Sequence, residues 1–119
     1  MNNIISLDYQ SRTPIYEQII KQIEKYVALG ILKPKEQIPS IREMAGNLGI
    51  NPNTVKKAYS ELENKGVIQT ISTKGTFISD NVDEIKKINI ESKIDEIKEI
   101  INELEKFGIT KDEIIEKLK

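Results

Sequence analysis

The chain has 119 residues, with 18 basic and 19 acidic side chains, and it contains no cysteine, histidine or tryptophan. This composition excludes disulfides, the common zinc sites and nucleophilic triads, so we expect no catalytic centre, no metal and no cofactor. The sequence does not begin as a signal peptide, and no apolar run approaches the roughly 20 residues that span a bilayer. We therefore expect a soluble, cytoplasmic binding protein without a membrane partner.

Charge is distributed unevenly along the chain. Residues 1–80 carry 10 basic and 8 acidic side chains, whereas residues 81–119 carry 8 basic and 11 acidic ones. An asymmetry of this kind indicates two parts with different partners. The sequence therefore predicts a domain over residues 1–79 and a tail over residues 80–119.

The first part opens with an extended pattern followed by a helix. Apolar and polar side chains alternate weakly over residues 2–12, which is compatible with a short strand or an extended arm. Thr13 and Pro14 predict a helix start, with threonine as the cap and proline at the first helical position. An apolar stripe at helical spacing follows, and Gly30 ends this helix.

Two short helices separated by a tight turn come next. Ser40 and Glu43 have the spacing of a capping box, and Asn51 followed by Pro52 starts the second helix by cap and proline. Gly49 lies in the turn, and both helices carry apolar residues at positions i, i+3, i+4 and i+7. Such a pair is typical of a helix-turn-helix.

After Gly66 the pattern changes from helical to extended. Residues 67–71 and 76–78 predict two strands, and residues 72–75 form the loop between them. A hairpin directly after a helix-turn-helix predicts a winged helix.

The tail has the pattern of a helical hairpin. Apolar residues spaced four and three apart form a seam along a charged helix, Gly108 ends that helix, and Thr110 with Glu113 caps a short last helix. The hairpin is too small to bury its own apolar face, so we predict a subunit interface; a core against the first helix is the alternative. The residues predicted for dimerisation are Ile90, Ile94, Ile97, Ile101, Leu104, Ile114 and Leu118.

The helix that starts at Asn51 is the candidate for DNA contact. Polar side chains near a helix N-terminus can reach major-groove base edges and phosphates, and the terminus itself offers free N–H groups to an anion. Arg42 is predicted to bind a phosphate or a base, and Lys74 to reach the minor groove or a phosphate from the hairpin tip. An ordinary solvated surface is the alternative for each of these side chains.

Three runs in order resemble the GntR family of bacterial transcriptional regulators. They are residues 38–45 (Ile-Pro-Ser-Ile-Arg-Glu-Met-Ala), residues 48–59 and residues 62–68, and the likeness extends from about residue 5 to residue 79. The Asn-Pro-Asn-Thr-Val run and the short tail are similar to the YtrA subfamily, whose members carry a helical dimerisation region instead of a large effector-binding domain.

The resemblance implies a homodimeric repressor that binds an inverted-repeat, double-stranded DNA operator. The predicted DNA-contacting residues are Ser40, Arg42, Asn51, Asn53, Thr54, Lys56, Lys57, Lys74, Gly75 and Thr76. The chain departs from the family at Pro52, where many relatives have arginine, and in the wing, where Lys74 is the only cation at the tip. We predict no dedicated pocket for a small-molecule effector. The alternative function is a winged-helix module that binds another protein and no DNA.

Overall fold

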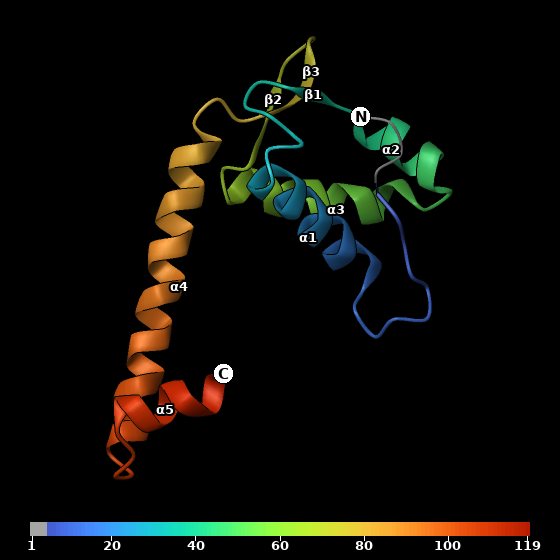
Figure 1. Cartoon of the computed structure of the whole chain (residues 1–119). Coiled ribbons are helices and arrows are strands. Elements are labelled where there is room, and N and C mark those ends of the chain that lie inside the picture. Colours follow the sequence, from blue (N-terminus) through green and yellow to red (C-terminus); the bar gives the residue numbers. More distant parts are fainter. Residues whose placement is uncertain (1–4) are drawn as a thin grey trace. The chain divides into compact units, whose positions relative to one another are not determined.

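The computed structural model describes residues 5–119, so residues 2–4 of the predicted strand or arm lie outside the described residues. The elements in chain order are α1 (Ile15–Ala28), β1 (Gln37–Ile38), α2 (Ile41–Leu48), α3 (Pro52–Asn64), β2 (Ile68–Ile71), β3 (Gly75–Ile78), α4 (Val82–Glu105) and α5 (Lys111–Leu118) (Figure 1). The chain divides into two compact units, Met1–Ile85 and Lys86–Lys119. Among residues 5–119, no helix is both long enough and apolar enough to cross a membrane.

Helices α1, α2 and α3 enclose the core of the first unit. α3 packs against both α1 and α2. The contacting faces are the apolar stripes that the helical spacing of the sequence predicts. The side chains of Ile19 and Ile23 from α1, and of Val55 and Leu62 from α3, are fully buried. Burial of these stripes is the main force that holds the three helices together.

The predicted caps are confirmed at α2 and α3. The Ser40 hydroxyl accepts from the Glu43 N–H at 3.1 Å, and the Glu43 carboxylate accepts from the Ser40 N–H at 3.4 Å. At α3 the Asn51 side chain accepts from the Asn53 N–H at 2.8 Å. Both helix starts are therefore fixed by side chains that the sequence places at the right spacing.

The predicted start of α1 is wrong by one residue. Pro14 is the N-cap, with ψ at 148°, and no side chain caps the helix. Thr13 is held outside the helix, because its carbonyl accepts from the Gln18 side-chain amide at 2.9 Å. The extended conformation of Pro14 then makes Ile15 the first helical residue.

Residues 5–8 form an extended arm along α1. Of the two predicted alternatives, a short strand or an extended arm, these residues adopt the arm. Gln22 accepts from the Ser6 N–H at 2.8 Å and donates to its carbonyl at 2.6 Å. Gln18 makes the same pair of bonds with Asp8, each at 2.9 Å. Two side-chain amides thus satisfy the backbone groups of the arm in place of a neighbouring strand, while Ile5 is buried in the core.

The sheet has three antiparallel strands in the order β1-β3-β2, one more than predicted. β2 and β3 form the expected hairpin, with Ile68 opposite Ile78 and Ile71 opposite Gly75. The missed strand β1 pairs with the other edge of β3 and places Ile38 opposite Thr76. The fold class, mainly helical with a small sheet arranged as a winged helix-turn-helix, is confirmed.

The first unit continues past the wing into the start of α4. Val82 is buried in its core, and the Ile85 side chain packs on Gly66 so closely that a Cβ there would lie 2.5 Å from its Cδ1. Gly66 also has a φ of +78°. Glycine is therefore required both for this backbone conformation and because the position leaves no room for a Cβ. The compact unit therefore extends six residues beyond the predicted boundary at residue 79.

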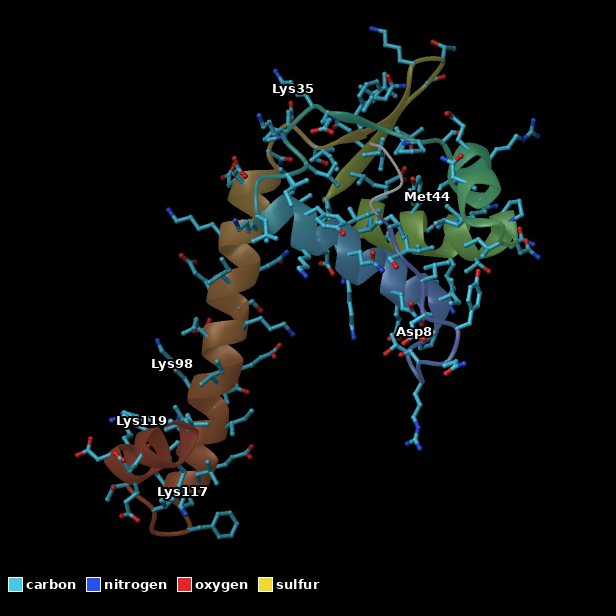
Figure 2. All side chains as sticks on the ribbon, turned by 45° about the vertical axis from the view of Figure 1, so that its right-hand side comes forward. Asp8, Lys35, Met44, Lys98, Lys117 and Lys119 are labelled. Carbon is cyan, nitrogen blue, oxygen red and sulfur yellow. The ribbon has the colours of Figure 1, made fainter. Side chains whose placement is uncertain are left out.

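The second unit is the predicted helical hairpin. α4 ends at Glu105, Gly108 turns the chain with a φ of +91°, and Thr110 and Glu113 form the predicted capping box at α5. Side chains stand out on all sides of α4, Lys98 among them (Figure 2). This exposure leaves the apolar seam of the helix open for contact.

Candidate nucleic-acid interface

Helix α3 has one buried and one exposed face. Val55, Ala58, Tyr59 and Leu62 are buried, whereas Asn53, Lys56, Lys57 and Ser60 are exposed. The exposed residues share one side because positions i, i+3, i+4 and i+7 lie above one another on a helix. Thr54 is half-buried beside them. The first two turns of α3 therefore present one amide, one hydroxyl and two ammonium groups to the exterior.

Helix α2 is held to α3 by a buried tyrosine. The Tyr59 hydroxyl donates to the carbonyl of Pro39, 2.7 Å away, directly before the Ser40 cap of α2. Burial, and to a smaller extent the negative charge of Glu43, raises the pKa of Tyr59 well above its usual range, so the hydroxyl remains a donor. The bond fixes the start of α2 and with it the position of Arg42, which is exposed in the first turn.

The predicted cations are not neutralised by carboxylates. Among residues 5–119, Arg42, Lys56 and Lys74 form no ion pair. Ser40 and Asn51 are both occupied as helix caps through their side-chain oxygens. The free positive charges of this surface therefore come from the arginine and the lysines. Ser40 and Asn51 stabilise the starts of the helices that carry Arg42 and Lys56.

Lys57 differs from the other cations because an aromatic ring holds it. Its ammonium lies 3.9 Å from the centroid of the Tyr16 ring, which is contributed by α1. The ring is half-buried against the core, and its hydroxyl donates to the Glu17 carboxylate at 3.3 Å. Sequence reasoning missed Tyr16, because its partner lies on another helix and no local pattern marks the pair.

The wing tip is tied to the edge strand of the sheet. The side-chain amide of Gln37 in β1 donates to the Lys74 carbonyl at 3.3 Å, and the Lys74 N–H donates to the Ile71 carbonyl at 3.0 Å. Gly75 has a φ of +127°, and a Cβ there would lie 2.6 Å from the Gln37 amide nitrogen. Glycine thus permits both the turn and the close approach. The Lys74 side chain is exposed at the tip.

The prediction that Thr76 contacts DNA needs a correction. Thr76 is only 7% exposed, and it lies in the central strand β3 between Ile38 and Thr70. Its side chain is covered by the neighbouring strands and is not offered to a partner. The residue supports the wing from inside the sheet.

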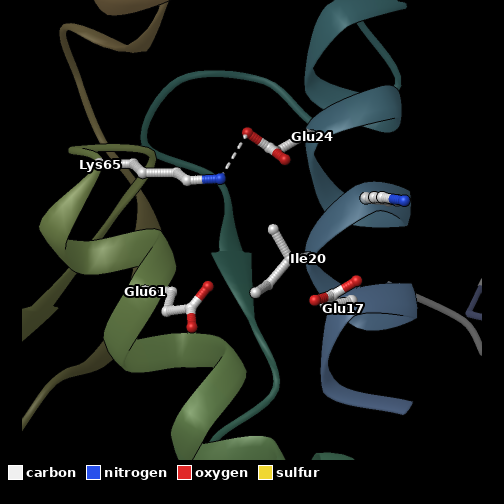
Figure 3. A pocket seen from close by; sticks show the side chains of 6 residues that line it. Glu17, Ile20, Glu24, Glu61 and Lys65 are labelled. Carbon is white, nitrogen blue, oxygen red and sulfur yellow. Dashed lines mark ion pairs between the residues drawn. The ribbon is translucent and has the colours of Figure 1, made fainter. Parts of the chain in front are cut away.

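A shallow pocket of about 200 Å³ between α1 and α3 marks a side of the domain that is unsuited to DNA (Figure 3). It is lined by three carboxylates and two ammonium groups, those of Glu17, Glu24, Glu61, Lys21 and Lys65, together with Ile20. The Lys65 ammonium pairs with Glu24 at 3.6 Å, so one positive charge is neutralised. The remaining negative charge disfavours phosphate and limits the contact surface on this side of α3.

In the second unit most of the predicted dimerisation residues are exposed. Ile90, Ile94, Ile97, Leu104 and Leu118 each expose more than a third of their surface, and Ile101 is half-buried. Sequence reasoning did not assign further exposed apolar side chains to the interface, because they lie outside the predicted set of dimerisation residues: Ile88, Ile100, Phe107 and Ile115. The exposed apolar surface is therefore wider than the predicted seam.

Ile114 is the exception, and its prediction needs a correction. It is only 7% exposed, because α5 turns back at Gly108 and buries this side chain within the hairpin. Ile114 stabilises the second unit itself and is not free to contact another subunit.

The family comparison assigns the first unit. The family model for bacterial regulatory proteins of the gntR family matches residues 15–78, which span α1 to β3. The chain belongs to the GntR family. Over 101 residues it is 46% identical to the HTH-type transcriptional repressor YtrA of Bacillus subtilis (strain 168), covering 85% of this chain and 75% of that protein. This similarity supports the resemblance to the YtrA subfamily.

Solved structures of similar proteins extend the comparison. The crystal structure of a transcriptional regulator from Oenococcus oeni is 38% identical, with a TM-score of 0.72, and covers 95% of this chain and 94% of that one. The DNA-binding domain of AraR, crystallised in complex with its operator ORR3, is 26% identical, with a TM-score of 0.54. That match covers 62% of this GntR chain and 89% of the AraR chain.

Proposed function

We propose that this GntR protein is a sequence-specific DNA-binding transcriptional regulator, and that it represses its target genes from the cytoplasm. The observation that carries the proposal is the exposed polar face of α3, where Asn53 and Lys56 lie beside a capped helix start and no carboxylate of residues 5–119 pairs with the lysine. In a helix-turn-helix this face enters the major groove. Arg42 on α2 then lies at a phosphate or a base edge.

We assign DNA binding to residues 1–79 and dimerisation to residues 80–119. The exposed seam of Ile90, Ile94, Ile97 and Leu104 in the second unit supports the second assignment. A homodimer presents two recognition helices, so its operator is an inverted repeat with half-sites about one helical turn, or a small multiple, apart. The pocket between α1 and α3 is shallow and lined by charged groups, so it is unsuited to a small-molecule effector, and we propose no effector.

Selection of bound duplexes from a random DNA pool by the purified full-length protein tests the proposal. We expect an inverted repeat to be enriched, and the affinity for the enriched duplex to fall steeply as salt concentration rises, because phosphate contacts release counterions. A scrambled duplex of the same composition is the control for sequence specificity.

Two results would contradict the proposal. A pool that yields no enriched sequence would remove sequence-specific binding. Absent or salt-insensitive binding would favour a winged helix that contacts another protein. Enrichment of a single half-site without a repeat would contradict the homodimer alone.

A further inference from the structure

The contact between Lys57 and Tyr16 joins the outward face of α3 to helix α1. The Lys57 ammonium lies 3.9 Å from the ring centroid, within the range in which an aromatic quadrupole attracts a cation. Lys57 is exposed, whereas Tyr16 is half-buried against the core. The ring is therefore the fixed member of the pair, and the lysine is the member that it holds.

This arrangement orders the lysine without cancelling its charge. A free lysine has one of the largest side-chain entropies, which it loses when it binds a phosphate. Lys65, at the C-terminal end of the same helix, offers a contrast, because its ammonium pairs with the Glu24 carboxylate at 3.6 Å and is neutralised. A neutral ring leaves the full positive charge of Lys57 available, and the ammonium still has donors directed away from the ring.

The position of Lys57 suits a phosphate next to the base-reading residues. It lies one helical turn after Asn53 on the same exposed face of α3, and directly after Lys56. A cation at this place meets the DNA backbone at the edge of the groove that the start of α3 enters.

We propose that Tyr16 is a positioning residue, whose ring holds the Lys57 ammonium in place for one phosphate of the DNA backbone. The inference rests on the proposed DNA-binding function and adds α1 to the binding surface. Tyr16 acts through Lys57 and not through its own hydroxyl, which is directed to Glu17.

Four variants of the full-length protein test the inference on the duplex enriched by selection. Tyr16→Leu removes the ring, Tyr16→Phe keeps the ring without the hydroxyl, and Lys57→Met removes the charge while keeping a long side chain. Lys56→Met is the matched control, because this lysine lies on the same face and has no ring partner among the described residues. Affinity is measured over a series of salt concentrations.

We expect Tyr16→Leu to weaken binding about two- to fivefold, as for an exposed cation–π contact, and Tyr16→Phe to bind as the unaltered protein does. Lys57→Met reduces the slope of log affinity against log salt by about 0.9, the value for one phosphate. Tyr16→Leu has no further effect when combined with Lys57→Met, but its effect is undiminished in combination with Lys56→Met.

A spectroscopic measurement separates this role from simple packing. The ε-methylene protons of Lys57 are shifted upfield in the free protein by the ring current of Tyr16, and Tyr16→Leu abolishes this shift. Tyr16→Phe retains it. Thermal unfolding of each variant shows whether loss of the ring also loosens the first unit.

Several results would overturn the inference. Unchanged or tighter binding by Tyr16→Leu would mean that the ring is irrelevant to Lys57 or withdraws it from DNA. A loss with Tyr16→Phe equal to that with Tyr16→Leu would assign the effect to the hydroxyl. A loss that persists in the Lys57→Met background would assign it to packing. If the unaltered protein binds no DNA, the proposed function fails together with this inference. If the unaltered protein and Tyr16→Leu bind DNA with the same affinity, only this inference fails.

Discussion

The side-chain amide of Gln37 donates to the backbone carbonyl of Lys74, 3.3 Å away, and so joins the edge strand β1 to the tip of the wing. The two residues lie far apart in the sequence, and antiparallel pairing of β1 with β3 brings them together. Gly75 leaves the space through which the amide approaches. Lys74, the only cation among residues 72–75 of the wing tip, is thus carried on a turn that a second element restrains.

Replacement of Gln37 by alanine is expected to loosen the wing without unfolding the protein. The bond is exposed, so its loss lowers the free energy of unfolding by about 1 kcal/mol or less. Hydrogen exchange of the Lys74 amide should become faster, because its turn opens more often. Gln69→Ala is the matched control, since Gln69 flanks Phe77 from β2 on the other side of β3. Equal exchange rates in both variants would contradict the role of Gln37.

Thr73 is expected to be a strained residue in the same turn. It has a φ of +67°, a conformation that is unfavourable for a β-branched side chain. Thr73→Gly should raise the free energy of unfolding by about 0.5–1 kcal/mol, although glycine also makes the unfolded chain more flexible. Chemical denaturation measures the change. Ser72→Gly is the control and should bring no gain, because Ser72 has no positive φ; a gain at both positions would exclude strain at Thr73.

Arg42 is expected to contribute to DNA affinity and little to stability. Its side chain is exposed and forms no ion pair among the described residues, so Arg42→Ala should change the free energy of unfolding by less than about 0.5 kcal/mol. The same variant should lose about 1–3 kcal/mol of binding free energy for the selected duplex. Fluorescence anisotropy measures binding, and Lys25→Ala, an exposed cation outside the predicted surface, is the control. Unchanged affinity of Arg42→Ala would exclude its predicted role.

The apolar seam of α4 is expected to hold the dimer. Ile97→Glu places an unpaired carboxylate in that seam, which costs several kcal/mol on burial and should weaken the dimer more than about a hundredfold. Light scattering over a concentration series measures the oligomeric state. Ile88→Glu is the matched control, because Ile88 is at least as exposed as Ile97 but precedes Ile90 by two residues, about 200° round the helix. Dissociation by both variants, or a monomeric unaltered protein, would contradict a seam of this kind.

The elements that local signals specify could be predicted from the sequence. The starts of α2 and α3 follow from a serine–glutamate pair and an asparagine–proline pair, because each cap is complete within three residues. The strand β1 could not be predicted, since two residues have no period and Gln37 and Ile38 become a strand only by pairing with β3. The start of α1 was mistaken because Gln18, one turn into the helix, draws Thr13 out of the capping position.

The candidate site shows the same division between local and distant causes. The exposed face of α3 follows from helical spacing alone, and Asn53 and Lys56 lie on it as predicted. The burial of Thr76 depends on strands at both of its sides, and that of Ile114 on the return of α5 at Gly108. Neither the strands beside Thr76 nor the return of the chain that buries Ile114 can be inferred from the residues next to these positions in the sequence.

Tyr59 is expected to make the stability of the first unit fall in alkaline solution. A tyrosine in the unfolded chain titrates near pH 10, whereas burial and the charge of Glu43 raise the pKa of Tyr59 in the folded protein. Its contribution is therefore complete below pH 10 and is lost above it, by about 1.4 kcal/mol for each pH unit until the folded protein also titrates. Tyr59→Phe should lower the free energy of unfolding at pH 7 by about 1 kcal/mol, because the bond to the Pro39 carbonyl is lost, and should reduce this alkaline loss. Chemical denaturation at pH 7 to 11 measures both effects, with the exposed Tyr9→Phe as control. An alkaline slope that is the same in Tyr59→Phe and in the unaltered protein would show that the buried hydroxyl is not its source.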